Sequence, residues 1–455
     1  MTVDTSNTGR STAAEISVVP RAPRQIRLVL GSLTTGALTA LVLTLVVFPG
    51  ATEPVITGSV LLAFGLGWAM LAMLSTRMTG QSHRWAWVPA AAMSITGALL
   101  VAFSPQDATM SALNWVWPPA ALVLAVWTWR RMRRSLRRAG RWLLTPVLVG
   151  LALAAIGATV EDITAVRLHH DYPAPGPTYT VGDHRLHIEC RGHGGPTVVL
   201  FNGLGEISAS WSRITEQVST TTRVCAYDRA GQGWSTDTTG PQDGITAAGD
   251  LHTLLATAGE SGPYVLVGHS IGGPYAMTYA QQYPEDVAGM VLLDSSSPRQ
   301  LTDIPDYAWQ YQLMRRGLAF LPTLARLGLG GVITPGSHLP GDAGEVVHAM
   351  TSTPRAERNG RDEVSMIPVV FKQAQQLTTL GARPLAVLTA SESLSTDGWA
   401  EAQDRLAGLS SNSLHRDVES THPGLLEDPD GSNASVAAIK AVVAALSSGA
   451  RIASS

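Results

Sequence analysis

The sequence contains few charged residues and only two cysteines. Asp, Glu, Lys and Arg make up 15% of the 455 residues, which is a low share for a water-soluble protein. The cysteines do not have the spacing typical of a zinc site. The sequence also lacks a glycine-rich phosphate loop and a dinucleotide-binding fingerprint. These absences give no reason to expect a bound metal or nucleotide.

The few charges are distributed unevenly along the chain. Up to Val160 there are 13 Lys and Arg against 4 Asp and Glu, whereas the remainder carries 19 basic and 31 acidic residues. This asymmetry indicates that the two parts of the chain meet different environments.

Five long apolar segments fill the basic part of the chain. None contains a charged residue, each is close to the roughly 20 residues that a bilayer crossing requires, and tryptophans gather near their ends. The sequence therefore predicts a transmembrane domain of about five helices at 25–160. A signal peptide followed by buried core helices is the alternative, but five uncharged segments in a row are not typical of a soluble core. The segments are Leu28–Phe48, Val55–Leu74, Trp87–Phe103, Leu113–Trp129 and Trp142–Val160.

The connections between these segments alternate between arginine-containing and base-free. The positive-inside rule therefore predicts a cytoplasmic tail at 1–24 and places everything after the fifth segment outside the cell. The arginine-rich connection at 130–141 could contact nucleic acid, but its position favours anionic lipid head groups instead. The connections with arginine contain Arg21, Arg24 and Arg27; Arg77 and Arg84; and seven arginines from Arg130 to Arg141.

The acidic part begins with a predicted tether at 161–177. After it, short apolar runs alternate with helical stretches up to about residue 450, a pattern typical of a mostly parallel sheet covered by helices. Predicted strands are Thr178–Val181, His184–Glu189, Thr197–Phe201, Thr222–Tyr227, Tyr264–Val267, Gly289–Leu293, Leu385–Thr389 and His415–Val418. Predicted helices are Trp211–Val218, Thr246–Ala258, Gly273–Tyr283 and Trp399–Leu409.

Ser270 stands in a G-x-S-x-G pattern between a predicted strand and a predicted helix. That spacing suits a sharp turn that exposes one nucleophilic hydroxyl, although the serine could also be a small residue in a tight turn. The stretch FNGLG follows another strand, so the backbone N–H groups of Leu204 and Ile271 could form an oxyanion hole. An ordinary glycine turn is the alternative for FNGLG.

Four stretches, FNGLG, YDRAGQGWS, GHSIGG and THPGLLEDP, resemble the α/β-hydrolase superfamily in its serine-hydrolase branch of esterases, lipases and proline-iminopeptidase-like enzymes. They occur in the superfamily's order between Tyr179 and Ala445. The resemblance implies a mostly parallel eight-stranded sheet at 178–450, with a helical lid inserted at about 295–381. It does not extend to the membrane domain.

The resemblance also implies a catalytic triad. His422, directly after the last predicted strand, matches the position of the base. The superfamily usually places the acid after the strand at Leu385–Thr389, where this sequence has Glu392 and where Ser393 occupies the usual Asp position. Some members place it one strand earlier, where Asp294 stands. We favour Asp294, and Glu392 remains the alternative.

Together these features predict an outward-facing, membrane-anchored serine hydrolase that cleaves a carboxylic ester of a small-molecule or lipid acyl substrate. It would need no cofactor and would bind no nucleic acid; the sequence does not indicate an oligomeric state. A proline-iminopeptidase-type peptidase, a non-catalytic sensor with this fold, and a transporter with an appended domain are the alternatives. Because the superfamily's sheet order makes their strands neighbours, Cys190 and Cys225 are expected to form a disulfide or to remain two buried thiols.

Overall fold

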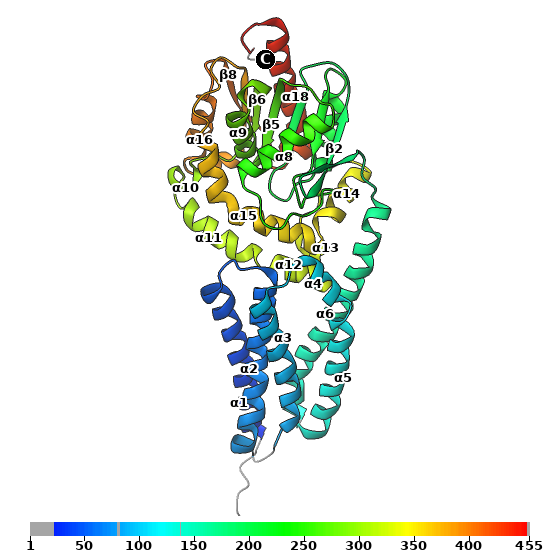
Figure 1. The fold of residues 1–455 in the computed structure, drawn as a ribbon. Coiled ribbons are helices and arrows are strands. Elements are labelled where there is room, and N and C mark those ends of the chain that lie inside the picture. The colour runs from blue at the N-terminus through cyan, green and yellow to red at the C-terminus, as the bar shows by residue number, and fades with distance from the viewer. Residues whose placement is uncertain (1–21, 80–81, 137, 453–455) are drawn as a thin grey trace, which may run out of the picture.

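The computed structural model describes residues 22–79, 82–136 and 138–452. A bundle of long helices forms one end of the molecule and an α/β domain forms the other, with a layer of shorter helices between them (Figure 1). The predicted cytoplasmic tail at 1–24 lies outside the described residues except for its last three positions.

The bundle contains four helices that are long and apolar enough to cross a membrane, or five spans if one bent pair of helices counts as a single span. The four are close to the segments predicted from the sequence. The helices of the bundle are α1 (Ala22–Val42, continued by η1, Leu43–Val47), α2 (Glu53–Thr79), α3 (Trp87–Phe103, preceded by η2, Arg84–Ala86), α4 (Asp107–Asn114), α5 (Trp117–Ser135) and α6 (Arg138–Asp171).

The predicted fourth segment is broken rather than continuous. Helices α4 and α5 meet at an angle of 46°, and Pro118 and Pro119 lie in the first turn of α5. Proline has no backbone N–H and cannot donate to the turn before it, so the helix must restart at this point.

The predicted tether is helical over most of its length. Helix α6 has 34 residues and ends only at Asp171, so at 1.5 Å per residue it is about 50 Å long, against roughly 30 Å of hydrocarbon in a bilayer. The charges at Glu161 and Asp162 end the apolar run without ending the helix. Only the short stretch after Asp171 connects α6 to the first strand.

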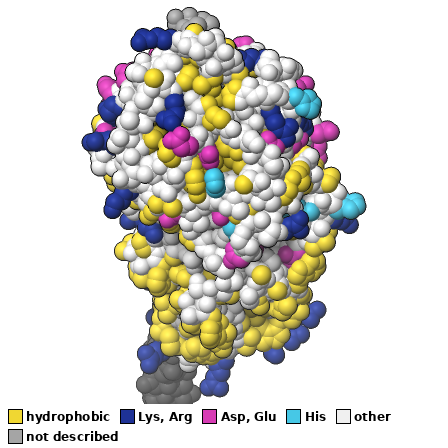
Figure 2. Space-filling model, turned by 45° about the horizontal axis from the view of Figure 1, so that its top comes forward, with side chains coloured by type: hydrophobic (Ala, Val, Ile, Leu, Met, Phe, Trp, Pro, Cys, Tyr) yellow, Lys and Arg dark blue, Asp and Glu magenta, His cyan; other side chains and the backbone are white. Residues whose placement is uncertain are grey.

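The surface of the helical bundle is apolar. Figure 2 shows hydrophobic side chains covering the lower part of the molecule, Lys and Arg at its lower edge, and mixed charges above. Leu38, Val46, Ile95, Phe103 and Trp142 are each more than half exposed. A continuous apolar surface of this kind is rare on soluble proteins and fits a lipid environment.

The α/β domain is built on the predicted eight-stranded sheet, which is confirmed. The strand order is β1-β2-β4-β3-β5-β6-β7-β8. The first two pairings are antiparallel and all later ones are parallel. The strands are β1 (Thr178–Val181), β2 (His184–Arg191), β3 (Val198–Phe201), β4 (Val224–Tyr227), β5 (Tyr264–His269), β6 (Val287–Leu293), β7 (Leu385–Ala390) and β8 (Ser413–Val418).

Helices cover both faces of this sheet, as the continuous apolar runs of its central strands require. One face packs against α8, α9 and α15, and the opposite face against α7 and α18. The helices of these two layers, with the shorter helices that flank them, are η3 (Ser208–Trp211), α7 (Ser212–Val218), α8 (Gly244–Thr257), α9 (Gly272–Gln282), η4 (Pro284–Asp286), η6 (Ser393–Ser395), α16 (Trp399–Ala407), α17 (Gly424–Glu427) and α18 (Pro429–Ser448).

The insertion between β6 and β7 is helical, as expected for a lid. It lies between the sheet and the helical bundle (Figure 1). Its longest helix, α15, begins at Pro354 and is capped by the Thr353 hydroxyl, which accepts a hydrogen bond from the N–H of Ala356. The lid helices are α10 (Gln300–Asp303), α11 (Tyr307–Leu318), α12 (Leu321–Leu324), η5 (Ala325–Leu329), α13 (Gly330–Ile333), α14 (Asp342–Thr351) and α15 (Pro354–Ala374).

The lid is joined to the helical bundle by close packing and by buried charges. A Cβ at Gly157 of α6 would lie 2.2 Å from the carbonyl oxygen of Leu327, so only glycine allows this approach. Next to it, the Arg326 guanidinium pairs with Glu53 at the start of α2 and, at 2.9 Å, with Asp107 at the start of α4.

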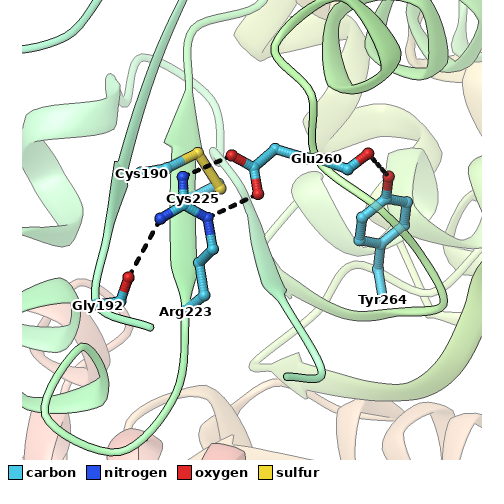
Figure 3. The surroundings of a disulfide bond; sticks show 6 residues. All are labelled: Cys190, Gly192, Arg223, Cys225, Glu260 and Tyr264. Carbon is cyan, nitrogen blue, oxygen red and sulfur yellow. Dashed lines mark hydrogen bonds and ion pairs between the residues drawn. A yellow bond between two sulfur atoms is a disulfide. The ribbon is translucent and has the colours of Figure 1, made fainter. Parts of the chain in front are cut away.

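Cys190 and Cys225 form a disulfide between β2 and β4 (Figure 3). The two cysteines are paired partners in the antiparallel ladder. Arg223, on the same edge of the domain, pairs with Glu260 and donates a hydrogen bond to the Gly192 carbonyl. Of the two expectations for the cysteines, the disulfide is the one observed.

Candidate active site

Ser270 lies in the sharp turn between β5 and α9, with a φ of 54°. A Cβ at Gly268 would come within 2.6 Å of the backbone of Gly273, and one at Gly272 within 2.2 Å of the Phe201 carbonyl oxygen. These contacts explain why glycine stands two positions before and two after the serine. The strained, half-buried Ser270 is held where the strand ends.

His422 and Asp294 form a hydrogen-bonded pair at the same edge of the sheet. Asp294 directly follows β6, His422 lies in the loop after β8, and His422 Nδ1 is 2.6 Å from Asp294 Oδ2. The carboxyl ends of parallel strands meet at one edge, which brings these residues together from 128 positions apart. The pairing leaves Nε2 as the ring nitrogen available to a second group.

The Asp294 carboxylate is fully buried and accepts several hydrogen bonds. Besides His422, its donors are the Ser393 hydroxyl, the indole N–H of Trp399 at 2.9 Å and the backbone N–H of Ala390 at 3.4 Å. Burial alone would raise the pKa of Asp294, but the hydrogen bonds, above all the one with His422, hold that pKa below its ordinary value. The carboxylate therefore stays ionised at neutral pH.

Glu392 contacts the backbone of His422, whereas Asp294 contacts its imidazole. It is exposed, and its Oε2 accepts a hydrogen bond from the backbone N–H of His422 at 3.0 Å. Glu392 therefore fixes the loop that carries the imidazole, whereas the Asp294 carboxylate contacts the imidazole itself. Ser393, at the superfamily's usual position for the acid, donates to Asp294.

Leu204 and Ile271 lie in the turns that follow β3 and β5. Within 22–79, 82–136 and 138–452, the backbone N–H of neither residue donates a hydrogen bond to another protein group. Strands β3 and β5 are hydrogen-bonded neighbours, so both turns emerge side by side. Two free N–H donors beside a serine hydroxyl can stabilise a developing oxyanion.

A second buried acid–histidine pair, Glu206 and His269, was not predicted from the sequence. The Glu206 carboxylate accepts hydrogen bonds from the Gly203 N–H and from Nδ1 of His269. The other ring nitrogen, Nε2, donates to the carbonyl oxygen of His422 at 3.0 Å. Because both ring nitrogens face acceptors, His269 must carry both protons and a positive charge to satisfy them.

The Glu206–His269 pair connects the three loops of the site. Through Gly203 it holds the turn that contains Leu204, and through His269 it holds the backbone of His422. Burial lowers the pKa of His269, but the charge of Glu206 outweighs that effect and raises it. Burial likewise raises the pKa of Glu206, but the charge of His269 outweighs the effect of burial and lowers the pKa of Glu206 overall.

These opposite shifts predict a pH-dependent contribution to stability. Because the pKa of Glu206 is lowered, its ionised carboxylate stabilises the folded protein above about pH 4.5. Because the pKa of His269 is raised, its charged imidazole stabilises the folded protein fully below about pH 6.5, and this stabilisation is lost as the pH rises further. Glu206→Gln should therefore lower the free energy of unfolding most near pH 6, by roughly 3 kcal/mol. The difference from wild type should shrink by pH 9. Thermal unfolding of the full-length protein at both pH values measures it.

The matched control is Glu216→Gln, because Glu216 is an exposed carboxylate on α7. That variant should unfold like wild type at both pH values. An equal loss of stability in Glu206→Gln at pH 6 and pH 9 would contradict a charged pair.

The comparisons with known proteins agree with this fold. Residues 196–329 match the family model described as "alpha/beta hydrolase fold". An epoxide hydrolase from Acinetobacter nosocomialis is similar in structure, with a TM-score of 0.50 and 15% identity over 62% of this chain and 95% of that one. The C-terminal part of the chain therefore has the α/β-hydrolase fold, and it is joined to a region of four to five apolar helices.

Two curated relatives match shorter stretches of the chain. An uncharacterized protein of Schizosaccharomyces pombe is 30% identical over an alignment of 236 residues, and the match covers 45% of this chain and 41% of that protein. The uncharacterized protein YbdG of Bacillus subtilis is 28% identical over 127 residues, 28% of this chain and 39% of that protein. The chain thus spans less than half the length of these relatives.

Proposed function

We propose that the chain is a membrane-anchored serine hydrolase that cleaves a carboxylic ester through an acyl-enzyme. The observation that carries the proposal is the hydrogen bond between buried Asp294 and half-buried His422 at the strand edge where Ser270 occupies its strained turn. Serine with an adjacent imidazole is the arrangement used for acyl transfer. Epoxide hydrolases and dehalogenases use a carboxylate nucleophile in this fold, and this chain has a serine there.

In the proposed reaction, the Ser270 hydroxyl oxygen attacks the ester carbonyl carbon while His422 Nε2 accepts its proton. The Leu204 and Ile271 N–H groups stabilise the negative oxygen of the tetrahedral intermediate. The intermediate collapses, His422 returns the proton to the leaving alcohol, and the acyl group stays on Ser270. A water molecule, deprotonated by His422, then releases the carboxylic acid and restores the serine. Asp294 holds the imidazole and stabilises its charged form.

The same proposal places the α/β domain outside the cytoplasm. The arginine-rich connection between α5 and α6 lies at the end of the bundle opposite the α/β domain (Figure 1), and such connections remain cytoplasmic. The disulfide supports this orientation independently, because disulfides are rare in reducing cytosol. The lid lies next to the membrane helices, which favours acyl substrates drawn from or near the lipid surface.

A membrane-impermeant fluorophosphonate probe tests activity and orientation together. Intact cells that express wild-type protein should be labelled, and cells that express Ser270→Ala should not. Labelling of wild type only after lysis would retain the hydrolase but reverse the orientation. Absence of Ser270-dependent labelling in both samples would favour the non-catalytic, ligand-binding alternative.

A further inference from the structure

A cavity with many charged side chains on its wall lies between one end of the helical bundle and the α/β domain. Its volume is about 560 Å³, within the range of ordinary ligand pockets. Ser270 and His422 are not among its lining residues, so it is distinct from the candidate active site. The walls come from 50–54 before and at the start of α2, from 104–108 before and at the start of α4, from the loops after β4, and from α11 and α15.

Each carboxylate on the wall of this cavity has an arginine partner. On the membrane side, Arg326 is shared by Glu53 and Asp107. On the side of the α/β domain, Glu363 pairs with Arg229. No wall carboxylate in these two groups is therefore left to attract a cation.

The remaining two carboxylates belong to α15 and to the loop that α15 contacts. Asp362 pairs with its neighbour Arg361. Asp237 pairs with Arg355 at 2.9 Å and also with Arg358. Five carboxylates are thus matched by five arginines.

Arg315 of α11 is the surplus cation. It is half-buried on the wall of the cavity, and its stem lies against Gly50, where a Cβ would come within 2.8 Å of its Cγ. Among the residues that the structure describes, Arg315 has no carboxylate partner. Four arginines and five carboxylates line the cavity. Once Arg326 and Arg355, which pair with wall carboxylates without lining the cavity, are counted as well, Arg315 is the guanidinium without a carboxylate partner among the described residues.

Two further arginines on the cavity wall, Arg358 and Arg361, each have one N–H group without a hydrogen-bond acceptor among the described residues. In both residues it is the Nε–H group, which is buried. Arg358 Nε lies 3.6 Å from Asp107 Oδ1 in an ion pair, and the side chain of Arg361 is only 9% exposed. An unsatisfied buried donor of this kind is unfavourable in the folded state. Burial lowers the pKa of the Arg361 guanidinium, and the positive charges of Arg358 and Arg315 add to that effect against the opposing carboxylates. Among the described residues, Arg315 thus lacks a counter-anion and the Nε–H of Arg361 lacks a hydrogen-bond acceptor.

We propose that this cavity binds a phosphate-type oxyanion, either as the head group of an anionic phospholipid or free in solution, through Arg315, Arg358 and Arg361. The guanidinium fork matches the geometry of phosphate oxygens and can donate two hydrogen bonds to one anion. The cavity lies where α2 and α4 begin, at the boundary between hydrocarbon and water, where phospholipid head groups lie. The proposal does not depend on the hydrolase activity.

The test uses the full-length protein, delipidated in an uncharged detergent. Thermal unfolding is followed with added inorganic phosphate, with phosphatidylglycerol and with phosphatidylcholine. Wild type should be stabilised by phosphatidylglycerol and not by phosphatidylcholine. Stabilisation by inorganic phosphate as well would identify the free oxyanion as sufficient, whereas stabilisation by phosphatidylglycerol alone would identify the lipid head group.

The variants are Arg315→Gln and its neighbour Arg316→Gln, because Arg316 is exposed and does not line the cavity. Arg315→Gln should raise the apparent dissociation constant for the anion at least 10-fold, and Arg316→Gln should leave it unchanged. Without anion, Arg315→Gln should unfold at or above the wild-type temperature, because it removes repulsion. A merely structural arginine would instead destabilise the unliganded protein when replaced.

Three results would overturn the proposal. They are no stabilisation of wild type by either anion, equal stabilisation by phosphatidylcholine and phosphatidylglycerol, and an unchanged response in Arg315→Gln. Arg315→Lys adds a check on folding, since it keeps the charge and should retain part of the response.

Discussion

Ser270→Ala is expected to reduce the turnover of a carboxylic ester by roughly 10⁶-fold, to the level of the residual transition-state binding. The variant removes the only atom that forms the acyl-enzyme in the proposed reaction. Alanine fits the site without a clash, although the positive φ of 54° remains unfavourable for it. Hydrolysis of a chromogenic ester by purified full-length protein measures the effect.

The control for Ser270→Ala is Ser395→Ala. Ser395 lies in η6 at the same edge of the sheet, but its exposed hydroxyl donates only to the Glu392 carbonyl. Turnover should remain within about twofold of wild type in this variant, because surface changes rarely exceed 0.5 kcal/mol. If Ser270→Ala retained the activity of the control, the hydrolysis would arise from another residue or from a contaminant.

Asp294→Asn is expected to lower kcat by about 10⁴-fold. Asparagine can present its N–H₂ to Nδ1 of His422 and so favour the tautomer in which Nε2 carries the proton. In that tautomer His422 cannot accept the proton of Ser270. KM should change little, because Asp294 is fully buried and in the proposed reaction contacts the imidazole instead of the substrate. The measurement is kcat and KM for the same ester.

Glu392→Gln is the matched control for Asp294→Asn. The Glu392 side chain accepts only the backbone N–H of His422, and the amide oxygen of glutamine can do the same. We expect a loss below 10-fold. A larger loss of kcat in Glu392→Gln than in Asp294→Asn would reverse the assignment of the acid.

The sequence predicts the sheet well because its strands are buried apolar runs bounded by turns. The sequence does not decide between Asp294 and Glu392 as the acid of the triad, and the reason is geometric. Strands β6 and β7 are neighbours, with Leu293 paired to Leu388, so Asp294 and Glu392 emerge at one edge of the sheet. Which carboxylate meets the imidazole depends on side-chain direction after the strand ends, and this direction has no sequence period.

Other features of the site also lack a sequence signal. Glu206 and His269 are 63 positions apart, and nothing in their local patterns indicates that they pair. The extent of α6 is missed because hydropathy marks where lipid contact ends, which is not where a helix ends. The break between α4 and α5 is signalled only by Pro118 and Pro119, which membrane helices often tolerate.

The contact of Arg326 with Glu53 and Asp107 has a practical consequence for dissecting the protein. Cutting the chain before β1 would leave a buried guanidinium without its partners, and breaking a buried pair in this way costs about 3–5 kcal/mol. It would also uncover the lid surface that Gly157 now contacts. A soluble fragment starting at residue 178 would therefore begin with a large stability deficit. The helices of the bundle thus complete the folding of the lid, besides anchoring the protein as we propose.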